Sequence, residues 1–397
     1  MDATDSRHSA GPAPRRERFK RAPNRGADNR TARAAGTNGN GHGADAAYDV
    51  ELVDETLREA RGEVLAELHR IFAARKRTGY GPLYDLLADY PFREGKGLRP
   101  AICLAACRAA GGRTEQAVLS ATALELFHNA FLVHDDVEDG SEFRRGKITM
   151  FRAQGVPIAI NVGDATNVLA IDPLLRNTET IGVRRALMVL REVERMARES
   201  AEGQAIELGW IADERFDLSD RDYVRMAYKK TCWYTVIAPL RIGVICGSAP
   251  GVTAPMEDEL DRLIELGFLA GIAFQIHDDL LNLEADEQLY GKERSGDLWE
   301  GKRTIMLLHF LRSASGRARS HVLRILRAPR SLKKEHDIRW LHGAMVDAGS
   351  LAYGRALAIE YSERAIALDT AGIAVLHSNR DRRFLREMLR YVIDRAK

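Results

Sequence analysis

Apolar residues recur at three- and four-residue spacing along most of the chain, which is the period of an amphipathic α-helix. In the stretch 48–72, for example, Val50, Val53, Leu57 and Val64 fall on one face of a predicted helix. The same pattern predicts helices at about 101–110, 114–134, 156–176, 180–211, 219–247, 255–283, 302–328, 332–347, 350–369 and 380–396. Nothing alternates with a period of two for long enough to predict a strand. The predicted fold class is therefore all-α, as a single large helical bundle.

Residues 1–46 depart from this pattern. They are rich in Arg, Gly, Ala, Asn and Pro and nearly lack large apolar side chains. Such a segment cannot bury enough surface to offset the entropy of ordering its chain. The sequence thus predicts a disordered basic tail over 1–46 and one domain over 47–397. A solubilising extension is the preferred interpretation of the tail, ahead of a nucleic-acid or membrane-surface arm.

Composition narrows the class of protein. The 397 residues are 45% hydrophobic and 29% charged, with a net charge of +2, so we expect a soluble globular protein and no nucleic-acid partner. The cysteines are too few for a disulfide framework and lack the CxxC spacing of zinc sites, which favours a reducing, cytoplasmic setting. No apolar run reaches 18 residues and no signal-peptide core is visible, so we expect no membrane-spanning segment.

The candidate chemistry begins where an apolar helix ends in three carboxylates. Asp135, Asp136 and Asp139 are followed closely by Arg144 and Arg145. Like charges one helical turn apart destabilise a helix by about 0.2–0.5 kcal/mol per pair. A bound cation would reverse that effect, and Mg²⁺ prefers such oxygen ligands, with water and substrate phosphates completing its shell. Taken alone, the stretch fits a solvated acidic helix end equally well.

A second acidic pair changes this balance. Asp278 and Asp279 again end a long apolar helix, about 140 residues after the first cluster. Two such clusters facing each other across a bundle could hold a diphosphate through Mg²⁺ ions. Basic residues stand in motif-like settings and could stabilise a departing diphosphate, namely Lys96, Arg99, Arg144, Arg145, Lys230, Lys292 and Lys302. Because the sequence has no nucleophile elbow, P-loop or dinucleotide fingerprint, the predicted chemistry is ionisation of a diphosphate ester.

Six short motifs follow one another between about residues 80 and 310. They read GKGLRP, HDDVEDGSEFRRGK, GQAIEL, YKKTCWY, FQIHDDLLN and GKERSGDLWEGKRT. In this order and spacing they resemble the polyprenyl synthetase family, the trans-isoprenyl diphosphate synthases. The resemblance implies a bundle of the isoprenoid synthase type with a central apolar cavity. One departure is Asn282, which ends the second acidic motif where many members have aspartate.

The resemblance also implies roles for individual residues. Two Mg²⁺ ions would be bound by Asp135 and Asp139, with Asp136 in support. A third ion would be held by Asp278, with Asp279 and Asp297. The allylic diphosphate would be held by Arg144, Lys230, Lys292 and Lys302. The diphosphate of isopentenyl diphosphate, the extender, would be held by Lys96, Arg99, His128 and Arg145. The catalytic set beside the reacting carbons would be Lys230, Thr231, Tyr234 and Gln275.

Product length is predicted from the helix that carries the first acidic motif. Phe127, Phe131 and Asp135 lie on one stripe, and Phe131 is one turn, about 6 Å, from the aspartate. In the resembled family, the residues four and five before the first aspartate set the pocket floor. A small Ala130 beside Phe131 therefore implies a C20 product, with C15 as the next choice.

Two other functions remain open. A class I terpene cyclase would ionise a diphosphate on the same scaffold without an extender, but would not need Lys96, Arg99 and His128. A non-catalytic partner subunit could lose its aspartates, whereas both pairs are intact here. The leading prediction is a Mg²⁺-dependent prenyltransferase, and the resemblance implies a homodimer.

Overall fold

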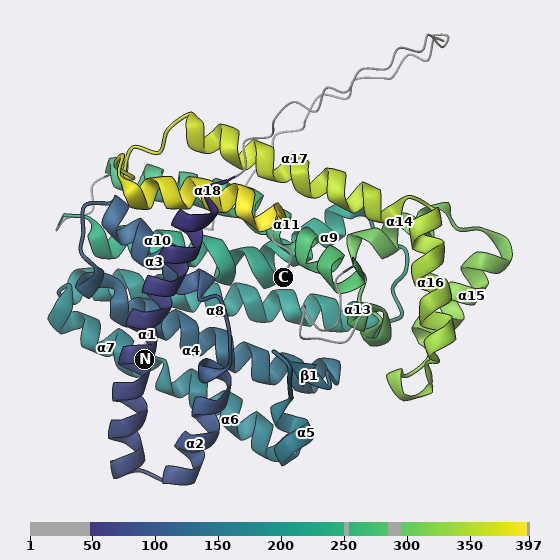
Figure 1. Ribbon diagram of the computed structural model, residues 1–397, viewed down its shortest axis with the longest axis horizontal. Helices are drawn as coiled ribbons and strands as arrows, with labels where there is room; N and C mark the ends of the chain where they lie inside the picture. Colours follow the sequence, from purple (N-terminus) through teal and green to yellow (C-terminus); the bar gives the residue numbers. More distant parts are fainter. Residues whose placement is uncertain (1–47, 250–253, 285–294, 395–397) are drawn as a thin grey trace, which may run out of the picture. The chain divides into compact units, whose positions relative to one another are not determined.

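The described part of the chain is almost entirely helical, which confirms the predicted fold class (Figure 1). The structure is a computed structural model that describes residues 48–249, 254–284 and 295–394. Its elements are α1 (Val50–Thr78), α2 (Gly81–Phe92), α3 (Leu98–Ala109), α4 (Thr114–Asp139), β1 (Phe143–Arg144), β2 (Lys147–Ile148), α5 (Met150–Gln154), α6 (Val156–Leu169), α7 (Ile171–Thr180), α8 (Val183–Ala212), α9 (Asp220–Ala227), η1 (Tyr228–Ile237), α10 (Ala238–Gly247), α11 (Ala254–Glu284), α13 (Gly296–Glu300), α14 (Ile305–Ser313), α15 (Gly316–Arg327), η2 (Arg330–Leu332), α16 (Glu335–Asp347), α17 (Ser350–Thr370) and α18 (Arg380–Asp394). The predicted tail lies outside the described residues.

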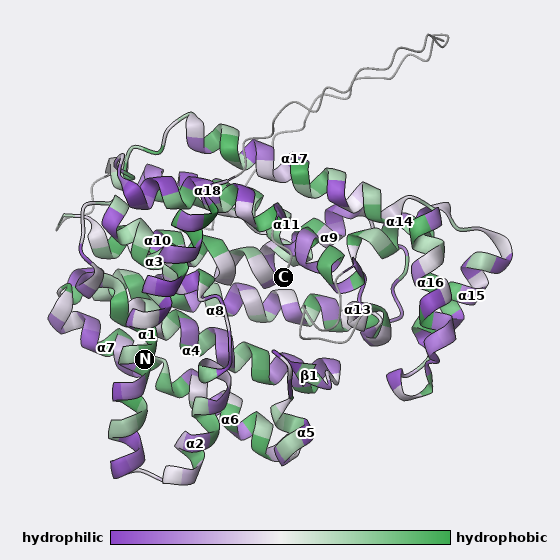
Figure 2. Cartoon of the chain, in the orientation of Figure 1, coloured by the Kyte–Doolittle hydropathy of each residue, from purple (hydrophilic) through white to green (hydrophobic). Residues whose placement is uncertain are grey.

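The long helices bury their apolar faces in two hydrophobic clusters, and Phe268, Tyr361 and Ile393 pack against both. Helix α11 packs against α17 and η1, while α3 packs between α10 and α4. Helix α18 is largely hydrophilic in Figure 2, yet Phe384, Leu385 and Met388 lie on a buried face against its neighbours. An amphipathic stripe of this kind stabilises a helix mainly through tertiary burial. The helical spacing read from the sequence is therefore the spacing that builds the core.

The segment predicted as one helix over 219–247 contains a π-helix in its middle. Ser219 caps α9 and forms a capping box with Asp222, and the chain then widens into η1 before α10 begins. A Cβ on Gly203 of α8 would overlap the backbone of Lys230, so that glycine lets α8 approach η1 closely. Gly271 of α11 does the same on the other side, against Cys232. Wide turns of this kind occur often at functional sites.

A short hairpin follows α4, although no strand is predicted. Helix α4 ends at Gly140 in the left-handed conformation, and β1 then pairs with β2 in antiparallel register. Arg145 and Gly146 form the connection, with φ of 53° and 71°, as a two-residue type I′ turn requires. Two-residue strands are too short to show alternation, so the sequence pattern could not reveal them.

One described segment, Val156–Thr180, is long and apolar enough to cross a membrane by length and composition alone. The sequence prediction had found no such segment. The segment consists of α6 and α7, which join at Ala170, and 44% of its most apolar window is buried in the domain. Core helices of soluble proteins pass the same test, so the finding is consistent with a soluble protein.

Candidate active site

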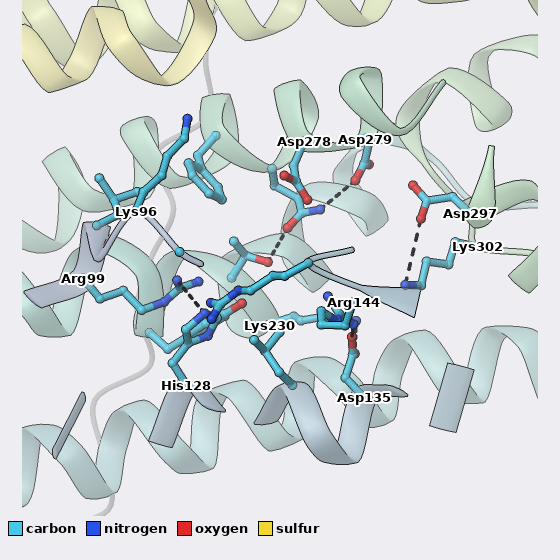
Figure 3. Close-up of a pocket in the computed structure, with 18 of the residues that line it drawn as sticks. Lys96, Arg99, His128, Asp135, Arg144, Lys230, Asp278, Asp279, Asp297 and Lys302 are labelled. Carbon is cyan, nitrogen blue, oxygen red and sulfur yellow. Dashed lines mark hydrogen bonds and ion pairs between the residues drawn. The ribbon is translucent and has the colours of Figure 1, made fainter. Parts of the chain in front are cut away.

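A cavity of about 680 Å³ opens between α4, η1 and α11 (Figure 3). Figure 3 shows Asp278 and Asp279 on one side and Asp135 on the other, with Lys96 and Arg99 towards one end and Lys302 towards the other. The apolar part of its wall includes Leu98, Leu132, Met226 and Phe274. Most of the lining is charged or polar, so the predicted apolar cavity is mixed in character.

The two aspartates of the first pair have different surroundings. Asp135 lines the cavity, whereas Asp136 is fully buried behind it. Asp136 accepts hydrogen bonds from the Tyr90 hydroxyl at 2.6 Å and from Arg144 Nε at 2.9 Å. The same guanidinium reaches Asp135 at 3.4 Å. Asp136 therefore fixes Arg144 at the cavity wall rather than facing the cavity itself.

The third aspartate of the first motif lies beside a lysine that is distant from it in the sequence. Lys302 Nζ is 2.7 Å from Asp139 and 2.9 Å from Glu300. Burial and the neighbouring charge of Asp135 raise the pKa of Asp139 to about 7. The carboxylates thus repel one another, and any added cation there would be stabilised.

The second acidic pair differs from the first, because both of its aspartates line the cavity. Asp279 is nevertheless almost fully buried and accepts hydrogen bonds from the Tyr223 hydroxyl at 2.8 Å and from Gln275 at 2.6 Å. Burial raises the pKa of Asp279 to about 7, although these two hydrogen bonds oppose the change. Gln275 also accepts from Thr231 at 2.5 Å. Three predicted site residues thus form one connected chain along the cavity wall.

Asn282, which departs from the aspartate of many family members, has a structural role. Its side-chain oxygen accepts a hydrogen bond from the backbone N–H of Asp297 at 3.0 Å. Its backbone oxygen accepts from Ser295, which is in the left-handed conformation with φ of 58°. Asn282 therefore holds the turn that brings Asp297 to the cavity, where Asp297 is one of the lining residues.

Lys230 is paired on both sides of its ammonium group. It forms an ion pair with Glu207 of α8 and lies 3.4 Å from Asp135. Burial alone would lower the pKa of Lys230, but Glu207 and Asp135 outweigh it and hold the pKa above its usual value. The lysine is fully charged at neutral pH and points its charge towards the acidic end of the cavity.

A second group of basic residues lies at the opposite end of the cavity. Arg99 donates to Thr235 at 2.9 Å and lies 4.2 Å above the ring of Tyr234. Arg99 is also 3.2 Å from His128 Nε2. Burial, and then Arg99, lower the pKa of His128 well below its usual value, so the ring is neutral and its Nε2 accepts from Arg99.

Two donors at this end lack a protein partner. Within the described residues, Nδ1 of His128 and Nε of Arg99 are buried without a hydrogen bond. Both residues line the cavity. Buried donors left unpaired cost about 1–3 kcal/mol each, so an anion placed there would recover that free energy. Lys96 and Arg145 line the same region, which brings the four predicted extender residues together.

Some predicted residues lie elsewhere. Lys292 falls outside the described residues. Ala130 is fully buried, and the Phe131 ring packs edge-on against Tyr234 with 5.9 Å between ring centroids. Phe127 lies a further 6.4 Å from Phe131. The predicted floor thus adjoins Tyr234, a lining residue, whereas the α4 residues of this stretch that border the cavity directly are His128 and Leu132.

The donor set fits Mg²⁺, although the geometry leaves ligands to be supplied. Among the described residues, no three His, Cys, Asp or Glu side chains converge tightly enough to form a metal site by themselves. Asp135 faces Asp278 and Asp279 across the cavity, and carboxylate oxygens are the donors that Mg²⁺ prefers. Mg²⁺ usually takes only one or two carboxylates and completes its shell with phosphates and water.

Four functional side chains were missed from the sequence. Tyr90 and Tyr223 each hold one buried aspartate, and Tyr391 lines the cavity beside Lys96. No local pattern marks these tyrosines, because their partners are distant in the sequence. Glu207, the partner of Lys230, was visible in the motif GQAIEL, and its carboxylate could have been assigned there.

Comparison with known proteins shows which family this chain resembles. Residues 82–345 match the polyprenyl synthetase family. The short chain isoprenyl diphosphate synthase of Methanothermobacter thermautotrophicus is 33% identical over 276 residues, covering 70% of this chain and 77% of the relative. The octaprenyl diphosphate synthase of Escherichia coli is 33% identical over 273 residues, covering 69% and 79%.

A solved structure agrees with these sequence matches. The geranylgeranyl pyrophosphate synthetase of Pyrococcus horikoshii superimposes with a TM-score of 0.74 at 28% identity, covering 87% of this chain and 98% of that one. The chain belongs to the polyprenyl synthetase family, the trans-isoprenyl diphosphate synthases. The family prediction is confirmed, whereas the relatives differ in product length and leave that length open.

Proposed function

We propose that this enzyme joins isopentenyl diphosphate to an allylic diphosphate and forms a C20 all-trans product, with C15 as the next choice. The observation that carries this proposal is the division of one cavity into two cationic ends. Lys230, Arg144 and Lys302 adjoin the aspartates, while Lys96, Arg99 and His128 form a second basic set in the lining of the same cavity. Two diphosphates therefore have separate places, as a condensation requires and a cyclisation does not.

The reaction follows from this arrangement. The allylic diphosphate loses its C1–O bond, and Arg144, Lys230 and Lys302 stabilise the charge on the departing group. The oxygens of Thr231 and Gln275, with the Tyr234 ring, ease the positive charge on the allylic carbon. The extender alkene attacks that carbon to form the new C–C bond. The extender then loses a proton to the released diphosphate, so no dedicated protein base is needed.

Magnesium completes the acidic end in this proposal. Asp135 and Asp139 would hold two ions, while Asp278, Asp279 and Asp297 would hold a third. When bound, Mg²⁺ neutralises the diphosphate charge and so assists its departure. The protein's own contribution is orientation: Asp136 and Tyr90 fix Arg144, and Asn282 fixes the turn of Asp297.

One assay tests the function and its two alternatives. Purified protein is incubated with Mg²⁺ and labelled isopentenyl diphosphate, with dimethylallyl, geranyl or farnesyl diphosphate as primer. Products are dephosphorylated and separated by chain length. We expect incorporation up to C20. Hydrocarbon released from an allylic diphosphate alone would identify a cyclase, and no turnover by the purified chain would favour a partner subunit.

Replacing Phe131 with alanine should lengthen the product beyond C20. Its ring packs against Tyr234 at the cavity wall, so removing it opens space along α4 for about one more isoprene unit. The matched control is Phe127→Ala, which leaves Phe131 in place and should leave product length unchanged. The measurement is the same chromatography, and an unchanged product from Phe131→Ala would remove this ring as the floor.

We also infer a homodimer that covers an apolar surface on α6, α7 and α8. Large side chains are exposed along two stripes, Val168, Ile171 and Leu175, then Val183, Leu187 and Leu190. Exposed apolar patches of this kind mark interaction surfaces. Leu187→Asp should convert the dimer to a monomer by light scattering, whereas Leu332→Asp, at a similarly exposed leucine on η2, should not. A wild-type monomer would contradict this inference.

The four cysteines support a reducing, cytoplasmic setting. Cys103, Cys107, Cys232 and Cys246 are all buried and unpaired. Thiols persist where the cell keeps them reduced. Fractionation of cells that express the tagged protein would test this proposal, and recovery outside the cytoplasm would overturn it.

A further inference from the structure

The last helix of the chain contributes a side chain to the extender end of the cavity. Tyr391 lies on α18, almost 300 residues after Lys96, and both residues line the cavity. The tyrosine is only 5% exposed. None of the motifs in the sequence includes α18, so this contact is independent of the evidence for the family.

Tyr391 contacts Lys96 in two ways. The Lys96 ammonium donates a hydrogen bond to the Tyr391 hydroxyl at 2.5 Å and lies 4.8 Å from the centre of its ring. The hydroxyl oxygen and the negative face of the ring both favour a cation. Lysine has four side-chain torsions and loses much rotamer freedom when it is ordered. A partner that orders Lys96 before a ligand binds therefore lowers the entropic cost of binding.

Helix α18 is itself held firmly against α3, the helix that begins just after Lys96. Arg108 near the end of α3 pairs with Asp381 at 2.6 Å. Arg382 and Arg386 both pair with the buried Asp369 of α17, at 2.6 and 2.8 Å. Helices α3 and α18 therefore run side by side in opposite directions. Tyr391, near the end of α18, reaches Lys96, which lies just before the start of α3.

The N-terminal end of the described domain supports Tyr391 from behind. The Tyr48 ring meets the Tyr391 ring edge-on, with 5.6 Å between centroids and an angle of 78°. Edge-to-face packing restricts the rotation of an aromatic ring. The position of the Tyr391 hydroxyl is thus determined by α18, α3 and Tyr48 together.

The geometry points to Tyr391 as a positioning residue for the extender diphosphate. It holds the ammonium of Lys96 at the cavity wall, where both residues are part of the lining. This inference rests on the proposed function of the basic end and adds a residue to it. Pre-orientation of Lys96 would lower the cost of ordering it when the extender binds.

The test is Tyr391→Phe in the full chain, which keeps the ring and removes the hydroxyl. We expect the KM for isopentenyl diphosphate to rise about tenfold, the lower end of the range for one hydrogen bond to a charged group. The KM for the allylic primer and the melting temperature should stay near the wild-type values. Tyr48→Phe is the matched control and should change neither KM.

Measuring Tyr391→Phe in a Lys96→Met variant distinguishes the positioning of Lys96 from a general structural effect of the substitution. In Lys96→Met, the further change Tyr391→Phe should raise the extender KM by less than twofold, because the residue it orients is already gone. An equal rise in both backgrounds, or no rise in the wild type, would overturn the role of Tyr391. Titration calorimetry with isopentenyl diphosphate gives the same comparison without turnover. If the wild-type chain binds no isopentenyl diphosphate, the proposed function fails and this inference fails with it.

Discussion

Asp135→Asn should lower kcat/KM by roughly a thousandfold, about 4 kcal/mol of transition-state free energy. Asp135 is the carboxylate of its pair that lines the cavity, and it is also within 3.4 Å of both Lys230 and Arg144. An amide keeps the shape of the side chain but removes the charge that attracts a cation. The measurement is steady-state incorporation of labelled extender at saturating Mg²⁺.

The matched control for Asp135 is Asp164→Asn. Asp164 lies on α6, its carboxylate is 66% exposed, and one of its oxygens lies 3.4 Å from His134 Nε2. This variant should retain wild-type activity. A second readout is independent of turnover: Mg²⁺ with inorganic diphosphate should raise the melting temperature of the wild type and of Asp164→Asn, but not of Asp135→Asn. Asp135→Asn with more than a tenth of wild-type activity would exclude Asp135 as a required metal ligand.

The fold class and most of the site were accessible from the sequence because both depend on local spacing. Apolar residues at helical intervals predict helices directly, and a pair of aspartates at the end of such a run predicts its place on α4 or α11. The DD spacing also carries a limit. Neighbouring residues on a helix point about 100° apart, so two adjacent aspartates cannot face one cavity in the same way. The structure turns Asp135 and Asp278 towards the cavity and buries Asp136 behind it, while Asp279 is almost fully buried at the cavity wall.

The partners of the buried aspartates could not be predicted, because they come from other elements. Tyr90 lies near the end of α2 and Tyr223 lies on α9, and neither stands in a recognisable motif. The π-helix was hidden for a similar reason. It depends on Gly203 and Gly271 of two neighbouring helices, which admit the backbone of η1, and only the packed structure shows those contacts.

The floor of the product pocket cannot be predicted from residue spacing along one helix alone. The stripe of Phe127, Phe131 and Asp135 gives the distance along α4 but not what lies beside it. Tyr234, from η1, packs on Phe131 and itself borders the cavity. Product length therefore depends on contacts between α4 and η1 as well as on α4 alone, and the Phe131→Ala assay measures that dependence.

Asp136→Asn should unfold the domain more easily, with about 3–5 kcal/mol less free energy of unfolding. Asp136 is completely buried, and its carboxylate receives Arg144, whose side chain is also buried. Removing one charge leaves the other uncompensated in the interior. Chemical denaturation, monitored by circular dichroism, measures the change, and Arg144→Ala should give a loss of similar size.

The double variant Asp136→Leu with Arg144→Met separates charge from packing. It leaves no unpaired buried charge, so it should recover much of the stability that either single change loses. It should still be inactive, because Arg144 is proposed to stabilise the departing diphosphate. Asp135→Asn provides the contrast within the same motif, since it should lose activity while keeping its free energy of unfolding. If Asp136→Asn were as stable as Asp135→Asn, the buried ion pair would not be what holds Arg144 in place, and the two aspartates would share one role.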